Sequence, residues 1–202
     1  MARRTPLYIF DLDGTLALID HRRPLVERPA CPHCGWHKAC DHSRDGTRPT
    51  FKPDWDAFYA ACVQDQVNKP VAKIFMTLLR SNSDIQIFSG RSEAVREQSE
   101  KWLLEQVGVY YDEDFFHMRP VGDFTPDDVL KRQWYENMLD EDKERLVAVF
   151  DDRDRVVHRD DLAGGARAVA SGHRQVHEHH VRVVLAHGLD GEIGSVEPGK
   201  LA

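Results

Sequence analysis

The sequence has no uninterrupted apolar run of the length that a membrane span or a secretory signal needs. Its basic start, Met1-Ala2-Arg3-Arg4, leads into the apolar stretch Leu7-Tyr8-Ile9-Phe10, but acids follow at once at Asp11 and Asp13. A transmembrane helix needs about 20 predominantly apolar residues, and a signal peptide needs an apolar region of about 7–15 residues. We therefore expect no membrane partner and a cytoplasmic location.

Positive charge and cysteine are also scarce. With 27 Lys and Arg against 34 Asp and Glu, the formal net charge is −7. This argues against binding along a long nucleic-acid tract, which depends on many phosphate contacts, but it allows the grip of one end or one nucleotide. Four cysteines in a chain without a secretory segment favour metal or core roles over disulfides. The 202 residues suit one globular domain with a small insert, and no internal repeat is present.

Two carboxylates follow the first apolar stretch, one residue apart. Leu7–Phe10 is apolar at every position, which is typical of a central parallel strand, so the next residues should lie at the sheet edge where open α/β folds bind ligands. Alternate side chains of an extended segment point the same way, so Asp11 and Asp13 share a side, and Gly14 allows a sharp turn. Like charges this close favour a hard cation such as Mg²⁺. The alternative is a capped turn before a helix.

Further polar groups follow two later apolar stretches. Asp84–Phe88 is followed by Ser89-Gly90-Arg91, where a hydroxyl, backbone N–H groups and a helix N-terminus could bind phosphate, or where the serine could simply cap a helix. Leu146–Phe150 is followed by the acids Asp151 and Asp152, a second pair that would complete a magnesium site. Lys131, on a predicted helix, would offset the crowded carboxylates and the charge of a substrate.

The pattern of elements predicts an α/β fold with a doubly wound, Rossmann-like parallel sheet. We expect helices over residues 54–64, 70–80, 92–107 and 126–139, and a further strand over residues 115–118. Beyond residue 159 the pattern weakens, and a last strand could come from residues 167–170 or 181–186. A histidine-rich tail there could bind a metal weakly or form a solvated end; it contains His173, His177, His179 and His180.

The run Asp11-Leu12-Asp13-Gly14-Thr15 resembles the signature of the haloacid dehalogenase (HAD) superfamily of phosphatases. More narrowly, the segment from Arg119 to Lys131 resembles the 3′-phosphatase domain of bacteriophage polynucleotide kinase/phosphatase enzymes, with the same spacing of Arg, Gly-Asp, Asp-Asp and Lys. The similarity covers roughly residues 7–18 and 70–160. A Gly-x-x-x-x-Gly-Lys-Ser/Thr loop is absent, so no 5′-kinase activity is assigned. Thr125 stands where those enzymes tend to carry a second Arg.

The resemblance implies a Mg²⁺-dependent phosphomonoesterase that acts on nucleic-acid 3′ ends or nucleotides through an aspartyl-phosphate. A small-molecule 5′-nucleotidase is the alternative, and a non-catalytic, zinc-stapled binding protein on the same fold is a further one. The resemblance also allows a phage-encoded origin; the oligomeric state does not follow. The implied catalytic residues are Asp11 as nucleophile, Asp13 as acid and base, Ser89 and Lys131. The implied substrate-binding residues are Thr15, Gly90, Arg91 and Arg119, and the implied magnesium ligands are Asp11, Asp13 through its carbonyl, Asp151 and Asp152.

An insertion over residues 20–65 separates the two parts of the expected phosphatase core, residues 1–19 and 66–202. Several prolines break it into loops, and the HAD superfamily places cap modules at this point, so the insertion is expected to shape substrate access. Its middle is locally basic, which suits a lid over an anionic substrate or a solvated surface loop. The basic residues are Arg22, Arg23, Arg28, Lys38, Arg44, Arg48 and Lys52.

The same insertion contains three of the four cysteines within ten residues. Cys31, Cys34, Cys40 and His42 have the ligand types and short spacing of a closed structural zinc site. Loops without a core of their own are natural places for such a metal. Free thiols or a redox Cys-x-x-Cys pair are the alternatives. Other candidates for the last ligand are His33, His37 and Cys62, although Cys62 also fits a buried position on a helix.

Overall fold

The structure is a computed structural model that describes residues 5–110, 114–153 and 181–185. The chain divides into two compact units. The first, here called the core unit, comprises Met1–Leu18 and Gln66–Ala202. The second, here called the inserted unit, is Ile19–Asp65. Among the described residues, no helix is long and apolar enough to cross a membrane.

A five-stranded sheet of order β5-β4-β1-β6-β7 forms the centre of the core unit. Its strands are β1 (Leu7–Phe10), β4 (Asp84–Ser92), β5 (Phe116–Arg119), β6 (Leu146–Asp151) and β7 (Arg182–Leu185). The first four pair in parallel, and β7 pairs antiparallel with β6. A small antiparallel pair is formed by β2 (Ala17–Leu18), which directly precedes the inserted unit in the sequence, and β3 (Gln66–Val67), which directly follows it. The predicted α/β fold with a parallel sheet is confirmed.

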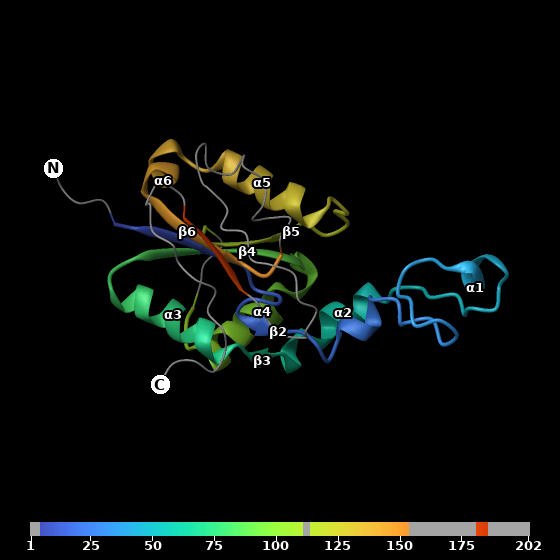
Figure 1. Cartoon of the computed structure of the whole chain (residues 1–202). Helices are drawn as coiled ribbons and strands as arrows, with labels where there is room; N and C mark the ends of the chain where they lie inside the picture. Colours follow the sequence, from blue (N-terminus) through green and yellow to red (C-terminus); the bar gives the residue numbers. More distant parts are fainter. Residues whose placement is uncertain (1–4, 111–113, 154–180, 186–202) are drawn as a thin grey trace, which may run out of the picture. The chain divides into compact units, whose positions relative to one another are not determined.

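Helices cover both faces of the sheet (Figure 1). On one side are α5 (Asp127–Asn137) and α6 (Asp140–Arg145), and on the other are α3 (Lys69–Arg80) and α4 (Arg96–Trp102). Alternation along β1 explains this, because Leu7 and Ile9 pack toward Trp134 of α5. Phe10 instead stacks at 4.1 Å on Phe150 and meets Phe75 of α3 at 5.0 Å.

The segment after β4 differs from the sequence-based expectation. The strand runs on to Ser92, and its pairing with β5 shifts register between Ser89 and Ser92, so Gly90 and Arg91 lie in an irregular part of the strand. The expected long helix is divided into a 3₁₀ turn η3 (Glu93–Val95), α4, and a π-helical segment η4 (Leu103–Val107). Ser89-Gly90-Arg91 therefore does not lead directly into a helix N-terminus. Within the described part of the chain the last strand is β7, inside the predicted range 181–186, whereas residues 167–170 and the histidine-rich tail lie outside the described residues.

The inserted unit contains four short helical elements. They are η1 (Arg23–Leu25), α1 (Asp41–Arg44), α2 (Trp55–Ala60) and η2 (Ala61–Gln64). Its two ends are joined by a buried ion pair: Arg22 Nε and Nη2 donate to the Asp65 carboxylate at 2.7 and 2.8 Å. The Arg22 guanidinium also lies 4.2 Å from the centre of the Phe58 ring. Cys62 is fully buried, as expected for a core position.

Candidate active site

The loop after β1 places two buried carboxylates at the carboxyl edge of the sheet. Asp11 continues the strand ladder, because its backbone N–H donates to the Phe150 carbonyl at 2.8 Å. The chain then turns at Gly14, whose φ of +93° is one that L side chains rarely adopt. A Cβ at Gly14 would lie 2.1 Å from a carboxylate oxygen of Asp152. Glycine therefore allows both the turn that presents Asp13 and the close approach of Asp152.

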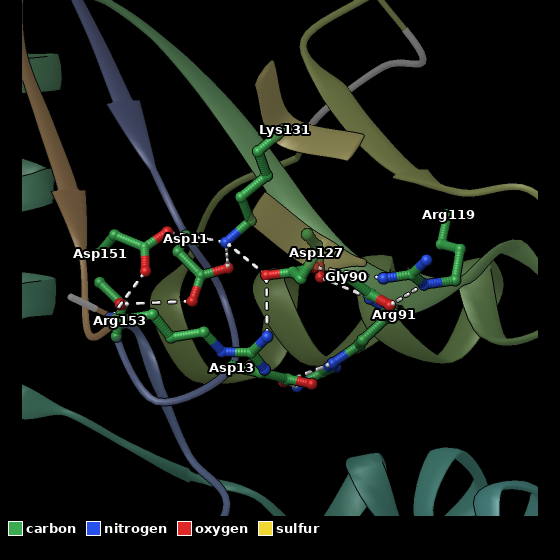
Figure 2. Close-up of polar contacts among 11 residues, drawn as sticks. Asp11, Asp13, Gly90, Arg91, Arg119, Asp127, Lys131, Asp151 and Arg153 are labelled. Carbon is green, nitrogen blue, oxygen red and sulfur yellow. Dashed lines mark hydrogen bonds and ion pairs between the residues drawn. The ribbon is translucent and has the colours of Figure 1, made fainter. Parts of the chain in front are cut away.

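A lysine from α5 joins acids from β1 and β6 (Figure 2). Lys131 Nζ donates to Asp11 Oδ1 at 2.6 Å and to Asp151 Oδ2 at 2.7 Å. Asp151 ends β6, and its Oδ1 accepts from the Arg153 backbone N–H at 2.8 Å. Lys131 is only 3% exposed, so its charge acts on these acids through a medium of low dielectric constant.

Burial and repulsion set the protonation of these groups. Burial is the largest influence on Asp11 and raises the pKa of its carboxyl well above the usual value, while the Lys131 ammonium opposes this rise. Three neighbouring carboxylates raise the pKa further: Asp151, Asp152 and Asp127. Burial alone would lower the pKa of Lys131, but Asp11, Asp151 and Asp127 raise it well above its usual value. Lys131 is thus a fixed ammonium among acids that are still crowded.

Three of these carboxylates form a group that fits Mg²⁺. One oxygen from each of Asp11, Asp151 and Asp152 lies within 4.8 Å of the others. Carboxylate oxygens are the hard ligands that Mg²⁺ prefers. Burial, and after it repulsion from neighbouring carboxylates, raises the pKa of Asp11, and a bound cation would oppose that rise. The Asp13 carboxylate is not in this group. A contribution from Asp13 would come from its backbone carbonyl.

Asp13 is held by an arginine from β4. Arg91 Nε and Nη2 lie 2.7 and 2.6 Å from Asp13 Oδ1. Arg91 also donates to the Ser99 hydroxyl at 3.2 Å and is 0% exposed. The sequence predicts Arg91 as a substrate clamp, whereas the structure commits its guanidinium to protein groups. A buried, two-point contact of this kind fixes the orientation of a carboxylate.

Asp127, the first residue of α5, connects the basic groups of the site. Its carboxylate lies 3.3 Å from Lys131 Nζ, 3.4 Å from Arg119 Nη2 and 3.0 Å from Arg153 Nη1. Burial would raise its pKa, but these cations outweigh burial and lower it. Sequence reasoning gave Asp127 and Arg153 no role. The position of Asp127 four residues before Lys131 on a predicted helix was a usable signal, since such residues share a face.

The predicted substrate-binding residues Thr15 and Gly90, and the predicted catalytic residue Ser89, also lie against other protein groups. Thr15 is fully buried and its hydroxyl donates to Asp11 Oδ2 at 3.4 Å. The Ser89 hydroxyl, also buried, accepts from the Arg91 backbone N–H at 3.2 Å. A Cβ at Gly90 would lie 2.1 Å from Asp127 Oδ1, so glycine is needed there for the approach of α5.

Arg119, at the end of β5, anchors the loop that leads into α5. Its Nε donates to the Gly90 carbonyl at 3.0 Å, and its Nη1 donates to the Thr125 carbonyl at 2.5 Å. Thr125 N–H donates in turn to Asp123 Oδ1 at 2.7 Å. The loop therefore has a fixed base beside the acids, while Phe124 in it is 91% exposed.

A second cluster of metal-ligating side chains lies within the inserted unit. Cys31, Cys34, Cys40 and His42 each place one ligand atom within 4.8 Å of the others. The Ser43 hydroxyl lies 3.6 Å from Cys40 Sγ and is the largest influence that lowers the pKa of the Cys40 thiol to about 6. These are the four residues that the sequence predicts as a zinc site.

Most of the basic residues of the inserted unit are engaged inside it. Arg22 is buried against Asp65, and Arg48 is buried against backbone carbonyls. The remaining two arginine pairs are local and exposed: Arg23 with Glu27, and Arg44 with Asp41. The expectation of a broadly basic lid is therefore weakened, because these charges neutralise or brace the unit itself.

The sheet order, the acid-lysine cluster at its carboxyl edge and the loop with two aspartates define a phosphatase of the HAD superfamily. A family profile described as "Polynucleotide kinase PNKP phosphatase domain" matches residues 45–161, more than half of the 202 residues. The chain belongs to this family. Asp11 and Asp13 precede the matched range, and the structure joins Asp11 to Lys131 and Asp13 to Arg91.

The solved structures that are similar to the chain include the following two. One, described as "Structure of Pnkp1/Rnl/Hen1 complex", is 24% identical with a TM-score of 0.51. The match covers 78% of this chain and 44% of the solved chain. The other, described as "Structure of the Pnkp1/Rnl/Hen1 RNA repair complex", is 24% identical with a TM-score of 0.49. That match covers 76% of this chain and 38% of the solved chain. The first likeness bears on the fold alone. This chain spans less than half of either solved chain, and no curated protein sequence matches it.

Proposed function

We propose that this chain is a Mg²⁺-dependent phosphomonoesterase that removes the phosphate from nucleic-acid 3′ ends. The observation that carries the proposal is the position of Asp11, which lies between the Lys131 ammonium at 2.6 Å and the acids that end β6. A buried carboxylate beside a fixed cation and a magnesium-compatible group suits attack on a phosphoryl centre. The family to which the chain belongs supports the reaction class.

Each catalytic step can be assigned to a residue of the site. Asp11 attacks the phosphorus, the bond from phosphorus to the ester oxygen breaks, and Asp13 donates a proton to that leaving oxygen. Water then attacks the phosphorus of the aspartyl-phosphate, Asp13 accepts its proton, and inorganic phosphate leaves as the Asp11 carboxylate is restored. Mg²⁺ held by Asp11, Asp151 and Asp152 would neutralise charge on the phosphoryl oxygens.

The surrounding residues have supporting roles in this proposal. Lys131 keeps Asp11 oriented and offsets the charge of the substrate, and Thr15 supports the second oxygen of Asp11. Arg91 is assigned as a positioning residue for Asp13, because its guanidinium is buried on that carboxylate. Asp127 holds Lys131 and Arg119 in register.

An exposed aromatic side chain supports a substrate that carries a base. Phe124 is 91% exposed in a loop whose base is tied to Arg119, and Arg119 in turn contacts Gly90 beside the acids. Stacking of a base on an aromatic ring contributes roughly 1–3 kcal/mol. Phe124→Ala should therefore raise the KM for a 3′-phosphorylated oligonucleotide about tenfold or more and leave the hydrolysis of p-nitrophenyl phosphate unchanged. Leu139→Ala, which removes an exposed apolar group beyond the far end of α5, is the matched control.

The decisive experiment compares phosphate release from a 3′-phosphorylated oligonucleotide with release from nucleoside 3′- and 5′-monophosphates, with and without Mg²⁺. Preference for the oligonucleotide is expected, with activity reduced on the order of 10³-fold or more in Asp11→Asn. Preference for one 5′-monophosphate would replace the proposal with a nucleotidase. Absence of turnover on every phosphomonoester would favour a binding protein on this fold.

A further inference from the structure

We propose that Cys31, Cys34, Cys40 and His42 bind one structural Zn²⁺ that orders residues 28–50 of the inserted unit. This site is separate from the carboxylate cluster of the core unit and uses a different ligand chemistry. Three thiolates and one imidazole are the donors of a closed tetrahedral zinc site, and they disfavour Mg²⁺.

The separations between the ligand atoms match such a site. Cys31 Sγ lies 3.8 Å from His42 Nδ1, and Cys40 Sγ lies 4.0 Å from the same nitrogen. A tetrahedral ion with Zn–S near ~2.3 Å and Zn–N near ~2.0–2.1 Å holds its ligand atoms about 3.5–3.8 Å apart. The four atoms, all within 4.8 Å of one another, therefore need only small shifts to close on an ion.

Local backbone structure brings the four ligands to one point. Gly35 N–H donates to the Cys31 carbonyl, and Cys31 N–H donates to the Trp36 carbonyl, both at 2.8 Å. Gly35 has a φ of +73°, and the resulting tight turn returns Cys34 toward Cys31. Cys40 is the residue before α1, so His42 follows within the first helical turn and lies on the same side.

A buried arginine fixes the loops that carry these ligands. Arg48 is 6% exposed and donates to the carbonyls of Pro29 and Lys38, both at 2.6 Å, and to that of His37 at 3.3 Å. Its Nη1 also lies 3.9 Å from Cys40 Sγ. One side chain thus joins the segments before and after the first ligand pair and prearranges the site.

These loops have no apolar core that could order them otherwise. Between residues 28 and 50 the only buried side chains are Cys31 and Arg48. A segment that buries so little apolar surface cannot offset its loss of conformational entropy by packing. Metal binding supplies that free energy in small modules, and here it would do so at the ligand cluster.

The structure also separates the fourth ligand from its alternatives. His37 Nδ1 lies 3.4 Å from the Arg28 carbonyl, and the His33 ring stands 4.9 Å from the His42 ring without joining the cluster. Cys62 is buried in η2 and is not part of the cluster either. Substitutions of these three residues are therefore matched controls for substitutions of the ligands.

The first test measures the metal content of the full-length chain by plasma mass spectrometry after desalting, with Co²⁺ substitution as a second readout. One zinc per chain is expected, together with the visible absorption of tetrahedral cobalt bound to thiolates. Cys34→Ser and Cys40→Ser should each lose both signals, and His42→Ala should weaken the affinity for Zn²⁺ at least tenfold. Cys62→Ala, His33→Ala and His37→Ala should retain them, and so should Asp11→Asn.

A folded chain that contains no zinc and gives no cobalt spectrum would overturn the proposal. So would zinc retained in both Cys34→Ser and Cys40→Ser, or zinc lost in His33→Ala and kept in His42→Ala. Asp11→Asn removes the proposed nucleophile and changes no residue of the inserted unit. Failure of the zinc site and failure of the phosphatase proposal therefore remain distinguishable.

A second test follows the order of the loops. Removal of zinc by a chelator should expose residues 28–50 to limited proteolysis, and Zn²⁺, but not Mg²⁺, should restore protection. Cleavage sites are identified by mass spectrometry of the fragments. Equal protection in the presence and absence of zinc would show that the loops are ordered by other means and would overturn the structural role.

Discussion

The two metal-ligand clusters of this chain are held in place by different means. At the sheet edge, Asp11 is fixed by a ladder bond to Phe150, and the strand behind it is fixed by the stacking of Phe10 on Phe150. Around Cys31 in the inserted unit, the corresponding support comes from one arginine and from backbone turns, and Cys31 is the only buried apolar residue between residues 28 and 50.

This difference bears on how each cluster depends on its metal. The packed sheet can hold carboxylates together in spite of their repulsion, because burial elsewhere in the core unit offsets the cost. The cysteine cluster has no such reserve, so metal binding and local folding should be coupled there. The site in the core unit should therefore remain formed without Mg²⁺, whereas residues 28–50 should lose their order without Zn²⁺.

The largest expected effect separates activity from stability in the core unit. Asp11→Asn should reduce phosphatase activity on the order of 10³-fold or more, because the nucleophile is lost. In the absence of Mg²⁺ the melting temperature of this variant should be higher than that of the unchanged protein at neutral pH. The raised pKa of Asp11 means that its ionised form opposes folding above the usual carboxyl pKa, and the amide removes that charge.

Activity assays and thermal unfolding of the same preparation check this prediction. Asp140→Asn, an exposed acid of α6, is the control and should change neither property. Activity that survives in Asp11→Asn would contradict the covalent mechanism. A lower melting temperature would instead show that the charge of Asp11 supports the fold.

The next effect concerns the stability of the inserted unit. Arg22→Met removes the guanidinium that pairs with the buried Asp65 carboxylate, and breaking a buried pair in this way costs about 3–5 kcal/mol. Arg44→Met removes an exposed pair with Asp41 and should change stability little. Urea unfolding followed by hydrogen exchange over residues 19–65 compares the two. Similar losses of stability in both variants would contradict the assignment of Arg22 and Asp65 as the ion pair that stabilises the two ends of this unit.

Much of the core unit could be predicted because its signals are local. The strand Leu7–Phe10 appears with the predicted bounds, since an apolar run between polar residues has one plausible use in a covered sheet. Asp11, Ser89 and Asp151 each follow an apolar run in the sequence, which also placed them at one edge, because carboxyl ends of parallel strands meet there. Lys131 comes instead from helix α5.

The features that the sequence did not predict depend on contacts between distant residues. The extension of β4 to Ser92 follows from its pairing with Arg119 across a bulge, which no local pattern shows. Arg91 and Asp13, which are in contact, are 78 residues apart in the sequence, and Arg22 and Asp65 are 43 residues apart. A long arginine side chain can serve a substrate or an interior acid, and the sequence alone does not distinguish these uses.

A smaller effect tests the role of Arg91 in that contact. Arg91→Lys keeps the positive charge but loses the two-point hold on Asp13, so kcat should fall about 10²-fold through misorientation while KM changes little. A substrate clamp would show the reverse, with KM raised and kcat nearly kept. Steady-state kinetics on a 3′-phosphorylated oligonucleotide separates the two. Arg96→Lys, which removes a partly buried arginine paired with Glu93 and Glu100, is the control for general loss of packing.

The smallest effect is a pH dependence of stability in the core unit. Burial is the main cause that lowers the pKa of His117 on β5, where its ring lies 5.0 Å from Phe88 and 6.0 Å from Trp134. A folded-state pKa below the unfolded value of about 6.5 means that the stabilising contribution is complete above that pH and is lost as the pH falls through the folded-state pKa. His117→Gln should flatten this decline. Urea unfolding between neutral and mildly acidic pH measures this decline in the free energy of unfolding. It is performed in the Asp11→Asn background, which removes the opposite contribution of Asp11. If the free energy of unfolding falls equally steeply with and without His117→Gln, His117 is not the group that titrates.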